Sequence, residues 1–280
     1  MSPPVLYSLK SAGVTGGEIA VLTFARPRRL NAWSPDVIET MQRCLKRAAA
    51  DPSVRAAILT GQGRYYSAGV DFGGSLGGLM LPSTMIAAAE KRNEALFETF
   101  IGFPKPLFAA CNGSAVGAAA TSALSLCDAV ISVRSATFLT PFKKLGITPE
   151  GCSSFTFPRT SKEAAKALLE EGRKVTANEC LDWGLVHLVV EDDCNVVDHA
   201  LTFAREWLAV GRGRKNAEEG QVDVQTLRRV NKEESKVLAA RFMQKPFLKA
   251  QYDFALSKKK SAAAWVFYLA LLAQPLISRL

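Results

Sequence analysis

Two apolar segments with a helical segment between them constrain the fold of this chain most. Residues 18–25 (EIAVLTFA) and residues 54–60 (VRAAILT) have the composition of buried strands. Between them, Ser34-Pro35-Asp36 is a helix start signal, and apolar residues then recur at helical spacing as far as Ala48. A strand, a helix and a second strand in this order predict two parallel strands joined by a crossover. The sequence therefore predicts an α/β fold.

Further elements follow along the 280-residue chain, which is 48% hydrophobic and 22% charged, as is typical of globular proteins. We expect short strands at residues 106–112, 129–133 and 136–138, helices at 83–103, 118–126, 162–171, 176–184 and 198–210, a mostly helical stretch at 215–256, and a last helix at 262–272. These elements divide the chain into a sheet-rich core, residues 1–195, and a C-terminal helical region, residues 196–280, suited to subunit contacts or to covering a site.

Glycine-rich turns stand at the ends of two of the expected strands. Residues 61–71 (GQGRYYSAGVD) follow one strand, and residues 113–117 (GSAVG) connect another to a helix of very small residues. A strand, a glycine turn and a helix N-terminus in succession leave backbone N–H groups unpaired, which can bind a ligand. Close packing of the helix on the sheet would explain the same pattern, so both interpretations stay open.

One acidic residue stands alone in its stretch of sequence. Glu150 lies in TPFKKLGITPEGCSS (residues 140–154) and is the only carboxylate between Asp128 and Glu163. Burial in apolar surroundings raises the pKa of a carboxyl group toward the range in which it can take and return protons near neutral pH. By itself, the Pro-Glu-Gly sequence is also typical of a simple turn.

Composition narrows the classes of function. With two histidines and six cysteines that form no CxxC pair, the chain has little from which to build a hydrolase triad or a zinc site, and we expect His187 to be structural and the thiols to be reduced. The net charge of +9 favours an anionic partner. Nucleic acid is not expected, because the basic clusters lack interleaved aromatic residues. No membrane span is expected, because the apolar run at residues 262–273 is too short.

Six segments resemble, in order and spacing, the crotonase superfamily, also called the enoyl-CoA hydratase/isomerase family. They are RPRRLNA (26–32), VRAAILTGQGRYYSAGVDF (54–72), NGSAVGAAA (112–120), CDAVISV (127–133), ATFLTPFKKLGITPEGCSS (136–154) and ANECLDWGLVHLVV (177–190). Within that superfamily, residues 140–158 look most like the peroxisomal Δ3,Δ2-enoyl-CoA isomerases. The resemblance implies a crotonase-like spiral of ββα units with a C-terminal helical region, assembled as a homotrimer or hexamer.

The resemblance also implies an acyl-CoA substrate, with coenzyme A as part of that substrate and with no further cofactor or metal. Two backbone N–H groups would bind the thioester oxygen, and the matching positions are Ala68 and Ala118. Such donors stabilise the enolate that forms when a proton leaves the carbon beside the thioester. The remaining positions expected to contact CoA or the acyl group are Arg28, Gly69, Val70, Asp71, Phe72, Phe142 and Lys249, with Arg28 and Lys249 as candidates for the CoA phosphates.

The sequence departs from the hydratases at their two catalytic acids, whose positions hold Thr121 and Phe142. A double-bond shift needs only one base, which takes a proton from C2 of a 3-enoyl thioester and returns it to C4, and Glu150 matches the isomerase glutamate. The sequence thus predicts a Δ3,Δ2-enoyl-CoA isomerase of fatty-acid β-oxidation. The alternatives are a dienoyl-CoA isomerase, a weak hydratase, or a non-catalytic acyl-CoA-binding module like those of chromodomain-associated proteins.

The last three residues, Ser278-Arg279-Leu280, are a conservative variant of the Ser-Lys-Leu peroxisomal address. For a fatty-acid enzyme this ending predicts recognition by the peroxisomal import receptor. We therefore expect the protein in the peroxisome or glycosome matrix.

Overall fold

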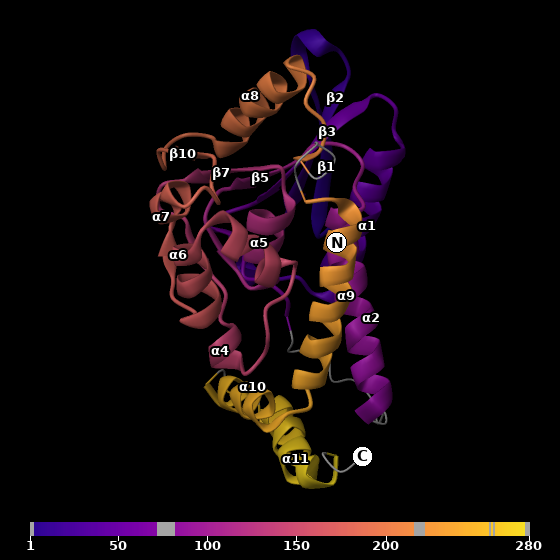
Figure 1. Cartoon of the computed structure of the whole chain (residues 1–280), viewed down its shortest axis with the longest axis vertical. Coiled ribbons are helices and arrows are strands. Elements are labelled where there is room, and N and C mark those ends of the chain that lie inside the picture. Colours follow the sequence, from indigo (N-terminus) through magenta and orange to yellow (C-terminus); the bar gives the residue numbers. More distant parts are fainter. Residues whose placement is uncertain (1–2, 72–81, 216–221, 258, 260, 278–280) are drawn as a thin grey trace.

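The computed structural model describes residues 3–71, 82–215, 222–257, 259 and 261–277 (Figure 1). Two of the sequence predictions lie outside the described residues: Phe72 as a contact of the substrate, and Ser278-Arg279-Leu280 as an import signal.

The strands form two sheets. The larger has the order β1 (Val5–Ser11), β2 (Glu18–Phe24), β3 (Val54–Gly61), β5 (Leu107–Cys111), β7 (Ala129–Val133) and β10 (Leu188–Val190), and the smaller has the order β4 (Tyr65–Ser67), β6 (Ser114–Val116), β8 (Thr137–Leu139) and β9 (Val175–Thr176). In the larger sheet β1 and β2 are antiparallel, and the other neighbours are parallel. The crossover predicted between β2 and β3 is confirmed, whereas β1 was not predicted, because much of it is exposed and its sequence has no continuous apolar run.

The two sheets alternate along the chain. Each of β3, β5 and β7 in the larger sheet is followed directly by a short strand of the smaller sheet, β4, β6 and β8 respectively. Helical segments then lead to the next strand of the larger sheet. This repeated strand-strand-helix unit is the predicted crotonase-like spiral, and the predicted fold class is confirmed.

The α-helices are α1 (Pro35–Ala50), α2 (Pro82–Ile101), α3 (Ala118–Thr121), α4 (Phe142–Leu145), α5 (Ser153–Thr160), α6 (Lys162–Ala165), α7 (Ala177–Asp182), α8 (Val196–Ala209), α9 (Val224–Arg241), α10 (Lys245–Ser257) and α11 (Ser261–Ile277). Two π-helical segments, Ser122–Leu126 and Lys166–Glu170, extend α3 and α6. A capping box at Thr176 and Glu179 opens α7 at the predicted position. Neither α4 nor α5 was predicted, and together they enclose the loop that carries Glu150.

Helices cover both faces of the larger sheet. The main core lies between the sheets and helices α1 and α2, and it includes Trp33, Phe97, Phe100 and Phe138. A second cluster packs α8 against the opposite face, where Trp207 contacts Phe108 edge to face. The helix α8 follows the boundary predicted at residue 195. That division of the chain stays a prediction.

The last helices extend away from the sheets. In Figure 1, α9 runs alongside α2, and α10 and α11 lie together at one end of the molecule. Phe142, Leu238, Phe247 and Phe267 form a separate apolar cluster that joins α4 to α9, α10 and α11. Over the described residues, none of these helices has the length and apolar character to cross a membrane.

Candidate active site

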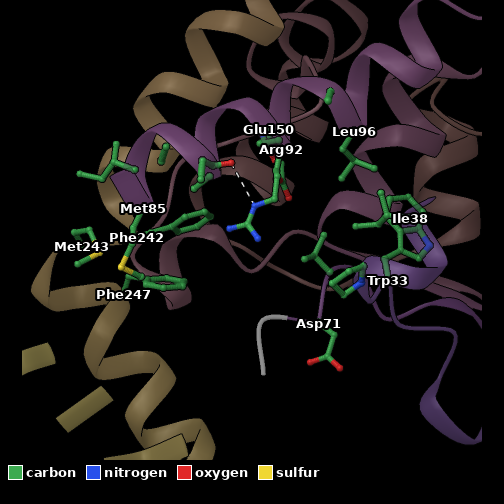
Figure 2. A pocket seen from close by; sticks show the side chains of 18 of the residues that line it. Trp33, Ile38, Asp71, Met85, Arg92, Leu96, Glu150, Phe242, Met243 and Phe247 are labelled. Carbon is green, nitrogen blue, oxygen red and sulfur yellow. Dashed lines mark hydrogen bonds between the residues drawn. The ribbon is translucent and has the colours of Figure 1, made fainter. Parts of the chain in front are cut away.

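Glu150 lies where two cavities meet. The loop between α4 and α5 carries it, and its residue is only 5% exposed. It lines a larger cavity of about 490 Å³, seen in Figure 2, and also a smaller cavity of about 250 Å³. A single carboxyl group therefore faces both spaces, and a ligand that occupied both would pass beside it.

Burial determines how Glu150 ionises. Burial, followed by the charge of the nearby Glu234 carboxylate, raises the pKa of Glu150 from 4.5 to about 8. A carboxyl group with a pKa near the working pH can exchange protons with a bound molecule in both directions. This agrees with the raised pKa expected from the sequence, whereas the contribution of Glu234 was not predicted.

The larger cavity is apolar along most of its length. Its walls come from α1, α2, α9, α10 and α11, and Figure 2 shows Met85, Leu96, Phe242 and Phe247 around it. The side chains that line it include Trp33, Ile38, Ile86, Ala89, Leu96, Ala239, Phe242, Met243, Leu248 and Phe267. Such a lining suits an alkyl chain better than a polar group. The residues of α9, α10 and α11 that line this cavity were not predicted, because apolar residues at helical spacing are equally typical of a helix that packs in the core.

The smaller cavity contains the backbone positions expected to bind a thioester oxygen. Ala68, Val70 and Ala118 all line it. The Ala68 N–H donates to the Leu30 carbonyl oxygen at 2.9 Å, so this donor is already used by the fold. The N–H groups of Val70 and Ala118 have no hydrogen-bond acceptor within the described residues. This geometry argues against Ala68 as a donor and in favour of Val70 beside Ala118.

Gly69 explains why Val70 rather than Ala68 has the free N–H. Its φ of +80° interrupts the extended backbone, so the N–H groups of Ala68 and Asp71 both reach the segment 30–33, while that of Val70 does not. A methyl group on Gly69 would lie 2.4 Å from the Val116 carbonyl oxygen and 3.7 Å from the Ala118 nitrogen. Only glycine fits at this position, and its lack of a side chain lets the backbone after β4 approach the end of β6 closely.

The other predicted contacts are distributed unevenly. Gly69 and Phe142 line the smaller cavity, and Asp71 lines both cavities. Arg28 is exposed on the turn Pro27–Arg29, and Lys249 is exposed on α10, where it pairs with Asp253 at 2.7 Å. Neither basic residue is among the described residues that line the two cavities, so their contact with CoA phosphates stays a prediction.

The two positions that hold acids in hydratases are buried here. Thr121 is fully buried, and its hydroxyl donates to the Ala118 carbonyl oxygen at 3.2 Å. Phe142 is 2% exposed and packs in the cluster that joins α4 to the C-terminal helices. Neither residue can activate a water molecule as a carboxylate would.

His187 and the cysteines take no part in this site. The Nδ1 atom of His187 accepts a hydrogen bond from the Val130 N–H at 3.2 Å, and burial lowers its pKa to about 4, which agrees with the structural role expected. The cysteines are free thiols. Across the described ranges, no three His, Cys, Asp or Glu residues come together as metal ligands, and the expectation of a metal-free protein stays a prediction.

Comparisons with known proteins agree on one family. The family model described as enoyl-CoA hydratase/isomerase matches residues 15–262. A human protein named enoyl-CoA delta isomerase 2 is 37% identical over 257 residues, which are 86% of this chain and 62% of that protein. A mouse protein named enoyl-CoA delta isomerase 3, peroxisomal, is 35% identical over 248 residues, covering 87% of this chain and 77% of the relative.

A solved structure supports the same assignment of fold. The crystal structure of an enoyl-CoA hydratase/isomerase from Pseudoalteromonas atlantica superposes with a TM-score of 0.74 at 26% identity, covering 91% of this chain and 97% of that one. This chain spans less than two thirds of the length of the human relative.

Proposed function

The chain belongs to the enoyl-CoA hydratase/isomerase family, and we propose that it is an enoyl-CoA delta isomerase that moves a 3-enoyl-CoA double bond to the 2-trans position. One observation carries the proposal. Glu150 is a single buried carboxyl group facing both cavities, and the positions of the two hydratase acids hold Thr121 and Phe142. The relatives named enoyl-CoA delta isomerases support the same reaction.

In this proposal the substrate lies across both cavities. The acyl chain occupies the larger cavity, the thioester lies in the smaller one, and the reacting carbons C2 to C4 pass the Glu150 carboxylate. Glu150 removes the proton from C2, and the electrons of that bond move toward the thioester oxygen to give a dienolate. The proton then returns from Glu150 to C4 while the double bond forms between C2 and C3. No water is consumed, and Glu150 ends in its starting state.

The N–H groups of Val70 and Ala118 stabilise the charge on the thioester oxygen in this scheme. Fixed donors are most effective where negative charge develops, because they need no reorganisation during the reaction. In enzymes that stabilise an oxyanion with such donors, removal of one donor costs about 100- to 1000-fold in kcat. The net charge of +9 would attract the polyanionic CoA.

Fatty-acid β-oxidation is the process that needs this reaction, and the mouse relative named peroxisomal supports a peroxisomal site of action. Assembly as a trimer or hexamer is also proposed. Exposed apolar side chains on α10 and α11, among them Phe254, Trp265, Leu269 and Leu272, support a contact between subunits there.

The test compares two reactions in the wild type and in Glu150→Gln. Isomerisation of a trans-3-enoyl-CoA is measured beside hydration of crotonyl-CoA. We expect isomerisation to exceed hydration greatly in the wild type and to collapse in the variant, since glutamine keeps the shape but cannot accept the proton. Hydration as fast as isomerisation would make the protein a hydratase, and CoA binding without turnover would make it a binding module.

A further inference from the structure

A second buried carboxylate lies behind the Glu150 loop. Glu234 sits in the middle of α9 and is 8% exposed. Its Oε2 atom accepts the Cys152 N–H at 2.6 Å, and its Oε1 atom accepts the Ser154 N–H at 2.9 Å. Both oxygens are thus occupied by backbone donors at the start of α5, within four residues of Glu150 in the sequence.

The backbone between Glu150 and these donors has an unusual conformation. Gly151 has φ +67° and Cys152 has φ +62°, so two successive residues are left-handed. The left-handed conformation is sterically unfavourable for cysteine, whose Cβ approaches the backbone, but not for glycine. A methyl group on Gly151 would also lie 2.7 Å from the Phe97 ring and from the Thr121 hydroxyl oxygen. A loop of this kind keeps its geometry only when contacts from outside it hold the backbone.

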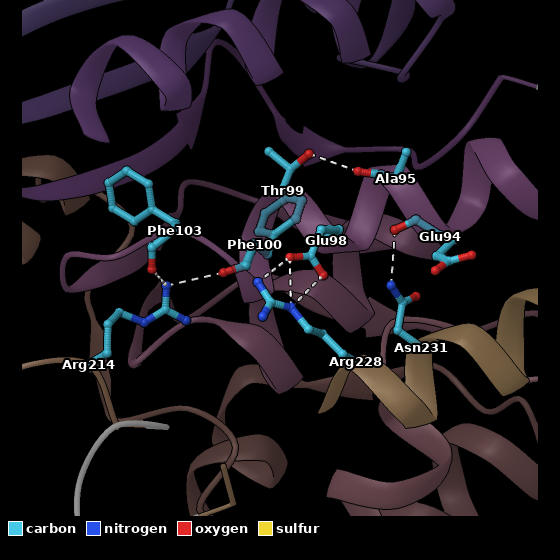
Figure 3. A network of polar contacts seen from close by, with 9 residues as sticks. All are labelled: Glu94, Ala95, Glu98, Thr99, Phe100, Phe103, Arg214, Arg228 and Asn231. Atoms are coloured by element: carbon cyan, nitrogen blue, oxygen red, sulfur yellow. Dashed lines mark hydrogen bonds and ion pairs between the residues drawn. The ribbon is translucent and has the colours of Figure 1, made fainter. Parts of the chain in front are cut away.

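Glu234 is well placed to hold that backbone, because α9 is itself fixed to α2. Arg228 pairs with Glu98 at 2.7 Å, and the Asn231 side chain donates to the Glu94 carbonyl oxygen at 3.0 Å (Figure 3). One turn further along α9, Ser235 accepts a hydrogen bond from the Asn93 side chain at 3.1 Å. The Glu150 loop is therefore hydrogen-bonded to a helix that is itself fixed to α2, and α2 lines the larger cavity.

We propose that Glu234 is a positioning residue for proton transfer by Glu150: its carboxylate fixes the loop backbone through two hydrogen bonds, and its negative charge disfavours a second charge on Glu150. This inference rests on the proposed isomerase function. Glu234 touches no reacting atom in it and acts only through Glu150.

The charges around the pair are consistent with this division of roles. Glu234 and Glu98 both raise the pKa of the Cys152 thiol on the loop, and Glu98 is paired with Arg228. On the other side of Glu150, the charged side chains that line the larger cavity with it are Glu39, Asp71 and Arg92. Burial raises the pKa of Glu234, but its hydrogen bonds from Ser154 and Cys152 oppose that rise. From the residues that the structure describes, the Glu150 carboxyl group accepts no such bonds, and both burial and Glu234 raise its pKa. Of the two carboxyl groups, Glu234 is therefore the one whose surroundings favour the charged form.

Three variants separate charge from position. Glu234→Gln keeps the length but removes the charge and one of the two acceptors. Glu234→Asp keeps the charge but is one methylene shorter. Glu233→Gln is the matched control, because Glu233 is the exposed neighbour on the same helix. For each variant, kcat and KM are measured for 3-enoyl-CoA isomerisation across the pH range.

We expect Glu234→Gln to shift the acidic limb of the kcat/KM profile down by about one pH unit, since a like charge is lost. Its plateau falls at least about tenfold, because a displaced base is a poor one. Glu234→Asp retains the wild-type limb but loses kcat with little change in KM, and Glu233→Gln behaves as wild type. A wild-type limb in Glu234→Gln, or a wild-type kcat in Glu234→Asp, would overturn the proposal. If Glu234→Gln does not fold, the kcat of Glu234→Asp tests the proposal by itself.

A measurement without substrate keeps this test separate from that of the isomerase function. Carbon NMR of labelled glutamate carboxyls follows the titration of Glu150, whose signal is the one absent in Glu150→Gln. We expect a lower pKa for Glu150 in Glu234→Gln than in the wild type. An unchanged titration refutes the electrostatic role of Glu234 whatever reaction the protein catalyses, whereas a shifted titration with no isomerisation refutes only the function.

Discussion

The burial of Glu150 should make the protein less stable at high pH, and replacing Glu150 should reverse this. In the unfolded chain this carboxyl group loses its proton near its ordinary pKa of 4.5, whereas in the folded protein it keeps the proton up to about pH 8. Between these values the folded protein binds more protons than the unfolded chain. The free energy of unfolding therefore falls as pH rises through this window, and it levels off above it.

The size of this effect follows from the shift in pKa. A rise from 4.5 to about 8 corresponds to up to about 5 kcal/mol, at about 1.4 kcal/mol per pKa unit. Glu150→Gln removes the ionisable group and keeps its shape. We expect equal stability of variant and wild type near pH 4, below the pKa of the unfolded chain, and a more stable variant near pH 9, by several kcal/mol.

Urea unfolding followed by circular dichroism at both pH values measures the difference directly. The exposed Glu233→Gln serves as control for the removal of one negative charge, and it should leave the pH dependence unchanged. A stability difference between Glu150→Gln and wild type that stays constant from low to high pH would refute the reasoning, because it would mean that Glu150 ionises normally in the folded protein.

Other variants test the remaining parts of the site and the fold. Gly69→Ala should abolish isomerisation in a folded protein, because the added methyl lies 2.4 Å from a backbone carbonyl beside the two free N–H groups; activity within tenfold of wild type would contradict this. Ala89→Phe, in the wall of the larger cavity, should raise KM for long 3-enoyl-CoA chains much more than for six-carbon chains, in steady-state assays. Asp128→Asn should destabilise the protein by about 3–5 kcal/mol in urea unfolding, since it leaves the buried Arg214 charge, 3.0 Å away, without its partner. If the proposed oligomer forms through α11, Trp265→Glu on its exposed face should reduce the mass measured by light scattering; an unchanged mass would contradict a subunit contact at α11.

The sequence predicted the parts of the site that depend on local pattern. Glu150 stands out because it is the only acid in its stretch, and the crossover from β2 to β3 follows from strand and helix signals that need no distant contacts. The strand β1 lacks such a signal, since its pairing with β2 depends on an edge of the sheet that only the folded chain presents. Val70 was named as a CoA contact but not as an N–H donor, because the turn at Gly69 decides which N–H groups face the cavity.

Glu234 could not be predicted because its importance comes from a contact between residues 82 positions apart. One signal was present: the stripe Leu227, Asn231, Glu234, Ser235 and Leu238 occupies one helical face and is buried, although three of its members are polar. A buried polar side chain requires a hydrogen-bonding partner. A polar group within an otherwise apolar helical stripe therefore indicates a contact elsewhere in the chain, even where the sequence does not show with what.

The position of Glu234 also changes the role expected for the C-terminal helices. The sequence suggested that residues after 195 cover the site or contact other subunits. In the structure α9 carries the carboxylate that holds the Glu150 loop, and α9, α10 and α11 close one side of the larger cavity. A spiral without these helices would keep Glu150 in the chain but would lose the contact that fixes its backbone and much of the apolar wall that raises its pKa. The packing of α9 against α2 is therefore coupled to the basicity of Glu150. A change that weakens this packing, such as loss of the ion pair between Arg228 and Glu98, should slow proton transfer although neither residue contacts the substrate.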